Sequence, residues 1–250
     1  MPERPAGPLR VCALYPDLMN IYADRGNLIV LERRCAWRGI AFELASSSLG
    51  EELDPENHDL YYMGGGQDRD QRLCAEDLLA NKRDALHAAA ERNALVLGVC
   101  GGYQLLGRSY SLGEEEIEGV GLLDVTTVRE AGPRLIGNVA IEVDGLPGLS
   151  GPAILAGFEN HGGRTRPGPA QATLGRVLEG HGNDGRSGFE GAISGNTIGT
   201  YLHGPLLPKN VWFADWLIAR ALGIQPTDLA PLEDGIEERT HAGALRAAGL

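Results

Sequence analysis

Short apolar runs that end in glycine or polar residues recur through the first hundred positions of the sequence. Such runs are typical of strands in a parallel sheet, where both faces are covered and apolar side chains need not alternate. Stretches with a helical spacing of apolar residues fill the intervals between them. This repetition predicts an α/β fold with an open, mostly parallel sheet flanked by helices. The strands are predicted at 9–14, 40–44, 59–63 and 94–97, and the helices at 28–37 and 70–92.

The C-terminal half of the chain has a different pattern, made of additional short β-strands separated by Gly, Pro, Asn and Asp turns. A last helix is predicted at 208–222, and the acidic stretch with Glu114, Glu115, Glu116 and Glu118 is predicted to be a solvated loop. We expect one domain over residues 9–222 and a tail over 223–250 that is either a docking helix or partly disordered. The short strands are predicted at 119–128, 137–143, 153–159, 173–179, 189–194 and 197–201.

The stretch ALVLGVCGGYQLL at residues 94–106 carries the first candidate chemistry. An apolar strand turns sharply into a helix there, and Gly98, Gly101 and Gly102 surround Cys100. Such a turn needs small residues, and it aims one side chain at the first turn of a helix. The free N–H groups and the helix dipole favour a thiolate at that point, so Cys100 is predicted to be a nucleophile. An inert core cysteine is the competing interpretation. It fits the remaining cysteines, which are Cys12, Cys35 and Cys74.

A cysteine nucleophile needs a base, and histidine is the usual one. His58 and His87 lie in a predicted polar loop and a predicted helix, where an exposed histidine is ordinary. His161 lies in the Gly-rich turn ENHGGRT, and His203 ends a predicted strand in GTYLHGPLLP. His203 is the better candidate, because the end of a parallel strand shares one edge of the sheet with the elbow.

Three consecutive glycines, residues 64–66, directly follow the predicted strand at 59–63. They place bare backbone N–H groups at the carboxyl end of that strand, which is the ligand-binding edge of an open α/β sheet. A flexible loop is the alternative interpretation. No Gly-Lys-Ser/Thr sequence follows, so this is not a phosphate-binding Walker A loop.

Composition and charge exclude several classes of function. The chain is 43% hydrophobic and 22% charged, which is ordinary for a soluble globular protein, and its 36 glycines are about twice the usual share. The net charge of −12 argues against nucleic acid and against an anionic membrane surface as partner. No stretch is apolar enough for a membrane span or a signal peptide, so we expect a cytoplasmic protein without membrane insertion. The four cysteines lack CxxC spacing, so we expect neither a metal site nor a disulfide framework.

Several motifs, in order along the chain, resemble those of class I glutamine amidotransferases. They are YPDLMNIYADRGN, GGGQDRDQ, GVCGGYQ, GFENHGGRT and GTYLHGPLLPKN. The resemblance is greatest to the CobB/CobQ-like branch, and within it to the GatD family, the glutaminase subunits of lipid II isoglutaminyl synthase. It covers about residues 9–222 and leaves the tail outside.

The resemblance implies hydrolysis of the side-chain amide of L-glutamine. Cys100 would attack the amide, and His203 would take up the proton and later protonate the leaving ammonia. The wider class has a glutamate two residues after its histidine, whereas Gly204 and Pro205 follow His203 here. The GatD family shares this absence, and there an acid from the partner ligase is thought to complete the triad.

The resemblance also implies an oxyanion hole and two substrate contacts. The N–H of Gly101, together with that of Gly65 or Gly66, would bind the oxyanion. Gln104 lies where the elbow helix of this family meets the substrate glutamine. Arg134 lies where the GatD family carries a glutamine-binding arginine, and a guanidinium suits the α-carboxylate.

The partner implied by the resemblance is a MurT-like, ATP-dependent ligase that forms a heterodimer with the glutaminase. ATP, Mg²⁺ and lipid II would bind to that partner, which would amidate the D-glutamate α-carboxylate, and this chain would need no cofactor. Three alternatives stay open. They are an amidotransferase subunit for another acceptor such as cobyrinate, a non-catalytic partner protein of the same fold, and a cysteine hydrolase on a related fold.

Overall fold

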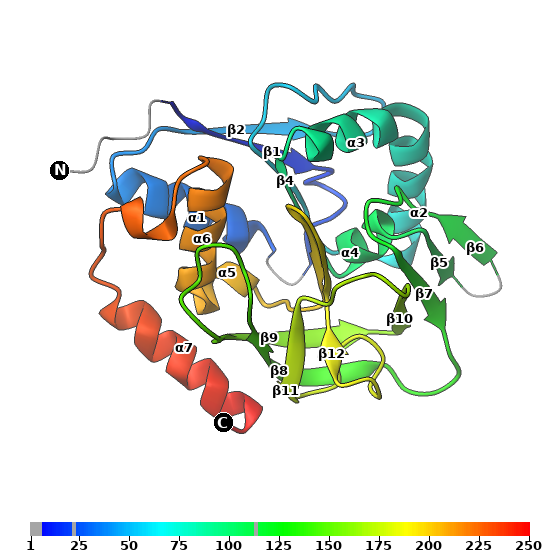
Figure 1. Cartoon of the computed structure of the whole chain (residues 1–250). Coiled ribbons are helices and arrows are strands. Elements are labelled where there is room, and N and C mark those ends of the chain that lie inside the picture. The colour runs from blue at the N-terminus through cyan, green and yellow to red at the C-terminus, as the bar shows by residue number, and fades with distance from the viewer. Residues whose placement is uncertain (1–6, 22–23, 113–114) are drawn as a thin grey trace.

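The centre of the protein is a six-stranded sheet, shown in the computed structural model of Figure 1, which describes residues 7–21, 24–112 and 115–250. The strand order is β13-β14-β4-β3-β1-β2, and each neighbouring pair is parallel except the β13–β14 hairpin at one edge. This sheet confirms the predicted fold class. Its strands are β1 (Leu9–Leu14), β2 (Phe42–Ser47), β3 (Leu60–Met63), β4 (Leu95–Val99), β13 (Ala192–Ser194) and β14 (Thr197–Thr200).

The position of each strand in the sheet follows from its sequence. The central strands β3 and β4 are apolar throughout and every residue in them is buried, as a strand covered on both faces requires. The strand β1 begins and ends where the sequence predicts. The edge strand β2 covers residues 42–47 instead of the predicted 40–44, and most of its residues are exposed.

Helices cover both faces of the sheet. Figure 1 shows α1, α5 and α6 on one side and α2 and α3 on the other, while the short helix α4 follows β4 directly. No helix in the described ranges is both long and apolar enough to cross a membrane. The bounds are α1 (Arg25–Trp37), α2 (Asp68–Asp77), α3 (Arg83–Glu91), α4 (Gly101–Leu106), α5 (Leu206–Lys209), α6 (Val211–Ala221) and α7 (Gly235–Ala248), with a 3₁₀ turn at Pro226–Asp228.

Two predicted helices are interrupted in the structure. The helix predicted at 70–92 contains a π-helical segment, Leu78–Lys82, between α2 and α3. The wider π turn ends at Lys82, whose buried ammonium forms an ion pair with the carboxylate of Asp77. The helix predicted at 208–222 is divided at Asn210 into two shorter helices. The side-chain amide of Asn210 donates to the carbonyls of Ala156 and Leu206, and these bonds fix the break.

Two four-stranded sheets contain the remaining strands, as the turn-rich pattern of the C-terminal half predicts. One has the order β10-β7-β5-β6 and the other has the order β12-β11-β8-β9. The strands of the first are β5 (Ser109–Leu112), β6 (Glu115–Glu118), β7 (Val125–Arg129) and β10 (Gly163–Pro167). The strands of the second are β8 (Leu135–Val143), β9 (Ala153–His161), β11 (Gly175–Glu179) and β12 (Phe189–Glu190).

The strand predicted at 119–128 is wrong in its first half. Strand β7 begins only at Val125, because the preceding residues bond to the end of α4. The N–H of Val120 donates to the carbonyl of Leu105, and the N–H of Leu123 donates to that of Leu106. The backbone therefore turns around α4 before it enters the sheet.

The solvated loop predicted for the acidic stretch is also wrong over Glu115–Glu118, which form the edge strand β6 against β5. Ile117 is buried and fixes the strand to the domain, while the three glutamates around it are exposed. One apolar residue among charged neighbours is therefore enough to form an edge strand here. Glu114 lies outside the described residues.

The tail beyond residue 222 contains the helix α7, which lies beside β8 and β9 (Figure 1). Asp234, just before this helix, forms an ion pair with the buried Arg34 of α1 at 2.8 Å. Near its other end, the amide of Asn138 donates to the carbonyl of Ala247 at 2.8 Å. Residues 235–248 are thus helical and contact the domain, and the docking role of the tail stays a prediction.

Candidate active site

Four loops meet at the carboxyl ends of neighbouring strands in the central sheet. They follow β1, β3, β4 and β14, and they carry Asp24, the glycines 64–66, Cys100 and His203. In an open α/β sheet this edge is where ligands bind. Because the strands lie in the order β14-β4-β3-β1, residues from both ends of the sequence come together at one edge.

Cys100 lies at a strained turn between β4 and α4. Its backbone has φ 52° and ψ −103°, a conformation that residues with a side chain seldom adopt. Its N–H donates to the carbonyl of Thr200 at 2.7 Å, and its own carbonyl accepts the N–H of Gln104 at 3.0 Å. These bonds hold the turn on both sides, so the geometry is that of the elbow expected from the sequence.

His203 is fixed by backbone pairing with β9. Its N–H donates to the carbonyl of Phe158 at 2.8 Å, and its carbonyl accepts the N–H of Phe158 at 3.1 Å. Burial lowers the pKa of His203, but the negative charges of Cys100 and Asp24 and their hydrogen bonds to the ring outweigh burial and raise the pKa to about 10. The raised pKa favours an imidazolium at His203 beside the Cys100 side chain, an arrangement that suits a cysteine nucleophile and its acid–base partner.

Asp24 is a site residue that the sequence analysis missed. Its Oδ1 lies 3.5 Å from Nδ1 of His203, and both side chains are fully buried. Its other oxygen, Oδ2, accepts the N–H of Gly65 at 2.7 Å. The sequence feature that could have identified Asp24 is a carboxylate in the loop after the first strand, which ends at the same sheet edge as the glycine loop.

The glycine loop contacts the elbow through its backbone. A Cβ on Gly101 would lie 3.0 Å from the backbone nitrogen of Gly66, so these two residues are adjacent. Within the described part of the chain, the N–H groups of Gly66 and Gly101 donate to no acceptor, whereas that of Gly65 is bonded to Asp24. The geometry favours Gly66 over Gly65 as the second donor of an oxyanion hole, and this role stays a prediction.

Cys100 lines a pocket together with both predicted substrate-binding residues, Gln104 and Arg134. The exposed side chain of Arg134 donates from Nε to Oδ1 of Asn160 and from Nη2 to the carbonyl of Asn160, each at 2.7 Å. This bidentate contact holds a guanidinium at the pocket, and its role in binding a carboxylate stays a prediction. Arg129 lines the same pocket, and the sequence analysis did not single it out.

Gln104 belongs to a buried chain of hydrogen bonds under the pocket. Its Oε1 accepts from Nε2 of Gln71 at 2.7 Å, and its Nε2 donates to the hydroxyl of Tyr201 at 3.1 Å. That hydroxyl also bonds Oγ1 of Thr165 at 2.6 Å, and the Tyr201 ring stacks on His161 with centroids 3.6 Å apart. The Gln104 amide is thus fixed, with one N–H and one lone pair left for a ligand. His161 lines the pocket in this stack.

The other three cysteines lie in the core, as expected. Cys12, Cys35 and Cys74 are buried and form no disulfide, and burial raises the pKa of each to about 12. They therefore remain thiols at neutral pH. Among the residues that the structure describes, no group of three or more His, Cys, Asp and Glu side chains is placed to hold a metal ion.

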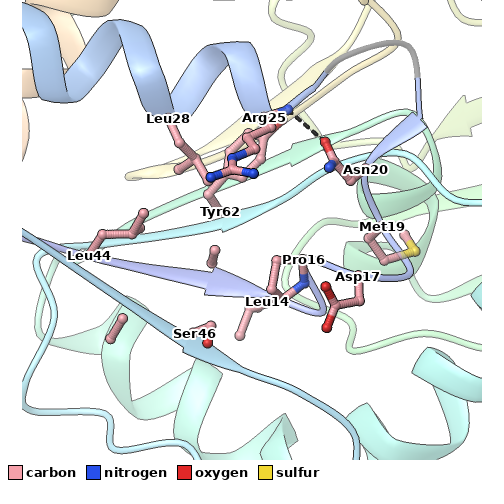
Figure 2. A pocket seen from close by; sticks show the side chains of 12 residues that line it. Leu14, Pro16, Asp17, Met19, Asn20, Arg25, Leu28, Leu44, Ser46 and Tyr62 are labelled. Atoms are coloured by element: carbon pink, nitrogen blue, oxygen red, sulfur yellow. Dashed lines mark hydrogen bonds between the residues drawn. The ribbon is translucent and has the colours of Figure 1, made fainter.

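A second cavity, of about 370 Å³, lies behind the loop that follows β1. Figure 2 shows it beside α1 and the ends of β1 and β2, with Arg25, Asp17 and Tyr62 among the lining side chains. It shares no lining residue with the pocket at Cys100. Met19 lines this cavity whereas Ile21 lines the pocket at Cys100, so nearby residues of one loop face different spaces.

The sequence matches the CobB/CobQ-like glutamine amidotransferase domain over residues 10–211. It is 38% identical to subunit GatD of the glutamine-hydrolysing lipid II isoglutaminyl synthase of Staphylococcus aureus, over 90% of this chain and 89% of that protein. The corresponding subunit of Streptococcus pneumoniae is 35% identical, over 86% of this chain and 80% of that protein. A cobyric acid synthase of Xanthobacter autotrophicus is 37% identical, over 65% of this chain but 33% of that protein.

The fold also has a counterpart among solved structures. The structure of PurLQS from Thermotoga maritima matches with a TM-score of 0.58 at 19% identity, covering 96% of this chain and 99% of the matched chain. At that identity the match supports the fold alone.

The family match spans the four loops that carry Asp24, the glycine loop, Cys100 and His203. The chain therefore belongs to the CobB/CobQ-like glutamine amidotransferase family.

Proposed function

We propose that this protein hydrolyses L-glutamine to glutamate and ammonia as the glutaminase subunit of a lipid II isoglutaminyl synthase. The observation that carries the proposal is the pairing of Cys100 with His203 at the ligand-binding edge of the sheet. The identity of 38% to a glutamine-hydrolysing GatD subunit, over most of both chains, supports this substrate and this assembly.

The first half of the reaction uses the paired Cys100 and His203. The thiolate of Cys100 attacks the amide carbon of glutamine, which forms a C–S bond and a tetrahedral oxyanion. The imidazolium of His203 gives its proton to the amide nitrogen, the C–N bond breaks, and ammonia leaves. A thioester remains on Cys100. Neutral His203 then takes a proton from water, the hydroxide attacks the thioester carbon, and glutamate leaves as the thiolate is restored.

The surrounding residues would bind the substrate and its oxyanion. The N–H groups of Gly66 and Gly101 would donate to the oxyanion, and one such donor is typically worth about 3 kcal/mol in the transition state. The guanidinium held by Asn160 makes Arg134 the candidate for the α-carboxylate. Gln104 would contact the substrate with its remaining donor and acceptor.

The acceptor of the ammonia would lie on another protein. We infer a heterodimer with a MurT-like, ATP-dependent ligase in the cytoplasm, in which ATP and Mg²⁺ bind to the ligase. That ligase would amidate the D-glutamate α-carboxylate of lipid II. The S. aureus and S. pneumoniae relatives are each named as one subunit of a synthase, which supports a partner. Transfer between subunits would keep ammonia out of water, where it would be protonated.

Cobyrinate is the second candidate acceptor, because cobyric acid synthases are also similar to this chain. This chain aligns with a third of such a synthase, whereas it aligns with most of a GatD subunit, and this difference favours lipid II. A non-catalytic partner protein would not need the thiolate and imidazolium pair. A peptide or ester hydrolase would not release ammonia from glutamine.

The test is an amidation assay with the chain purified together with its ligase partner. We expect Cys100→Ala and His203→Ala to lower glutamine-dependent amidation of lipid II by more than about 10³-fold, because each removes half of the reactive pair. Amidation driven by ammonium chloride should stay at the level of the unmodified complex. Cys74→Ala, at a buried cysteine outside the pocket, is the control. Full glutamine use by both site variants, or amidation of cobyrinate instead of lipid II, would contradict the proposal.

A further inference from the structure

We propose that Tyr15, Asp77 and Lys82 form a positioning cluster for the oxyanion hole of the glutaminase. We call these three residues the Asp77 cluster. All three side chains are buried, and they lie outside the pocket at Cys100. Their role rests on the glutamine hydrolysis proposed above, since it assumes that an oxyanion forms there. They would hold the backbone of the candidate donors in place and would not contact the substrate.

The first support of the oxyanion hole is the loop after β1, which packs against the glycine loop. A Cβ on Gly66 would lie 2.4 Å from Sδ of Met19, so this side chain packs directly against the backbone of one candidate donor. The N–H of Ile21 donates to the carbonyl of Gly65 at 3.1 Å. Because these contacts are close, a shift of the β1–α1 loop would also shift the N–H of Gly66.

The second support is α2, which follows the glycine loop and packs against the elbow. Nε2 of Gln71, in the first turn of this helix, donates to the carbonyl of Gly101 at 3.3 Å and to Oε1 of Gln104 at 2.7 Å. A Cβ on Gly101 would lie 3.0 Å from the amide carbon of Gln71. A shift of α2 would therefore move the other candidate donor, the N–H of Gly101.

The Asp77 carboxylate joins the two supports. Asp77 is the last residue of α2, and its Oδ2 accepts the hydroxyl of Tyr15 at 2.7 Å. Tyr15 is the first residue after β1, and its backbone has φ 51°, in a region that residues with a side chain seldom adopt. Its carbonyl accepts the N–H of Met19 at 2.8 Å. The bond between Tyr15 and Asp77 therefore fixes the turn that carries Met19 relative to α2.

Lys82, at the end of the π-helical segment, holds the Asp77 carboxylate in this position. Its ammonium pairs with Oδ2 of Asp77 and donates to the carbonyl of Ser48 at 3.0 Å. Oδ1 of Asp77 accepts the N–H of Gly50 at 2.7 Å. Burial raises the pKa of Asp77, but the hydrogen bonds from Lys82, Tyr15 and its other donors outweigh burial and lower the pKa to about 2. The carboxylate is therefore ionised at neutral pH.

A buried ion pair is a weak source of stability, because the loss of hydration offsets much of the attraction between its charges. Apolar replacement of a whole pair is often tolerated, whereas removal of one partner leaves an unpaired buried charge. Accurate placement of catalytic groups does require side chains that lock their supports. The position of the Asp77 cluster between the two supports therefore favours a role in placing the oxyanion donors.

Two variants test this role in the chain purified with its ligase partner. Tyr15→Phe removes only the hydroxyl that joins the supports. The triple variant with Tyr15→Phe, Asp77→Leu and Lys82→Met removes the cluster without leaving a buried charge. We expect kcat for glutamine hydrolysis to fall by about 10-fold in the first and about 10²-fold in the second, the scale of a misplaced catalytic group. KM should change by less than about threefold, because Arg134, the candidate for the α-carboxylate, lies on neither support.

Alkylation of Cys100 by iodoacetamide separates the oxyanion donors from the nucleophile. The thiolate forms a C–S bond as iodide leaves, and no oxyanion develops in this reaction. The alkylation rate, followed by mass spectrometry of the peptide that contains Cys100, should therefore stay within about threefold of the unmodified protein in both variants. A cluster that only stabilised the domain would not lower hydrolysis while it left alkylation unchanged.

The control is Arg83→Met, which removes a partly exposed ion pair with Glu118 one residue beyond Lys82 and should leave all rates unchanged. Thermal unfolding shows which variants are folded, and Tyr15→Phe decides the result if the triple variant is not. A folded variant with kcat within about threefold of the unmodified protein would overturn the role of the cluster. An equal loss of alkylation and hydrolysis would also overturn it, because the nucleophile would then be disturbed. Normal glutamine hydrolysis by Cys100→Ala would instead contradict the proposed function.

Discussion

Gly102 packs directly against the backbone carbonyl of Met63, with no room for a side chain between them. The N–H of Gly102 donates to the carbonyl of Gly64 at 3.0 Å, one residue further along the same segment. The first turn of the elbow helix therefore rests on the end of β3 and on the start of the glycine loop. The spacing between the Cys100 sulfur and the candidate oxyanion donors is set by backbone contacts, which are stiffer than contacts between side chains.

This contact makes Gly102→Ala the substitution that should disturb the elbow most. The added Cβ would overlap the Met63 carbonyl. A backbone shift that accommodates an extra methyl group typically lowers the free energy of unfolding by about 1–3 kcal/mol. A displacement of about 1 Å at Cys100 can lower the rate by about 10²-fold. We expect a lower midpoint of thermal unfolding and a lower kcat for glutamine hydrolysis.

The matched control is Gly137→Ala in β8, where a Cβ would meet no atom within 4 Å and φ is not positive. That variant should unfold and react like the unmodified protein. If Gly102→Ala did the same, the elbow would not depend on its contact with β3.

Arg134→Ala should weaken glutamine binding without affecting the chemical step. The guanidinium is held at the pocket by two hydrogen bonds to Asn160. Hydrogen bonds to a charged group contribute about 1.5–3 kcal/mol, which corresponds to a rise in KM of about 10- to 100-fold. We expect kcat to change little, because the α-carboxylate is bound equally in the ground state and the transition state.

Steady-state kinetics with glutamine decide this prediction. Arg166→Ala serves as control, since this exposed arginine pairs with Glu130 and does not line the pocket. Arg134→Lys should recover part of the affinity but lose the planar, two-point contact. An unchanged KM in Arg134→Ala would mean that Arg129 or another group binds the α-carboxylate.

The sequence was informative where the chemistry depends on one short stretch. Glycines on both sides of Cys100 predict a turn with an unusual backbone, and the structure has φ 52° there. His203 could be chosen over His161 because it ends a strand, and β14 indeed lies beside β4. Both conclusions need local spacing and the rule that parallel strands end at one edge.

The contacts that the sequence did not predict depend on strand order. Asp24 meets His203 because β1, β3, β4 and β14 are neighbours in the sheet, and no local pattern specifies that order. Arg129 ends the strand β7 in a separate small sheet, and only the packing of that sheet beside the elbow brings its side chain to the pocket. The strand β6 was missed because one buried residue, Ile117, decides its position among exposed glutamates.

Asp234→Ala should release α7 from the domain. The helix contains no fully buried residue, so polar contacts contribute much of its docking: those of Asp234 and Asn138 near its ends and the bond between the His241 ring and the Lys209 carbonyl in its middle. Asp234 pairs with Arg34, and this guanidinium holds the pKa of the Asp234 carboxyl below its usual range. A carboxyl group whose pKa is lower in the folded protein than in the unfolded chain stabilises the fold above about pH 4. This stabilisation is lost as the pH falls through the pKa of the folded protein.

Hydrogen exchange of the α7 amides measures this effect directly. We expect exchange in α7 to accelerate by about 5- to 50-fold at neutral pH in Asp234→Ala, which corresponds to about 1–2 kcal/mol. The unmodified protein should show the same acceleration at acid pH. Exchange in β3 and β4 should be unaffected, and unchanged protection of α7 would mean that other contacts hold the helix.

Glu190→Gln should remove a pH dependence from the stability of the fold. The Glu190 carboxyl is fully buried in β12, where it accepts the N–H of Tyr201 at 2.6 Å and the hydroxyl of Thr200 at 3.0 Å. Burial raises its pKa to about 8, and the nearby charge of Glu159 in β9 adds to the increase against the hydrogen bonds that oppose it. The group is therefore protonated in the folded protein at neutral pH.

The sign of the effect follows from the proton that the folded state retains. The unfolded carboxyl has a pKa of about 4.3, so between about pH 4.3 and 8 the folded chain binds one proton more than the unfolded chain. The free energy of unfolding should then fall as the pH rises, by up to about 1.4 kcal/mol per pH unit. A neutral glutamine cannot lose that proton, so this slope should be absent in Glu190→Gln. The variant should therefore gain stability relative to the unmodified protein as the pH rises toward 8.

Urea unfolding across this pH range measures the slope, and Glu43→Gln, at an exposed position on β2, should leave the slope unchanged. Parallel curves for Glu190→Gln and the unmodified protein would mean that the buried carboxyl stays ionised.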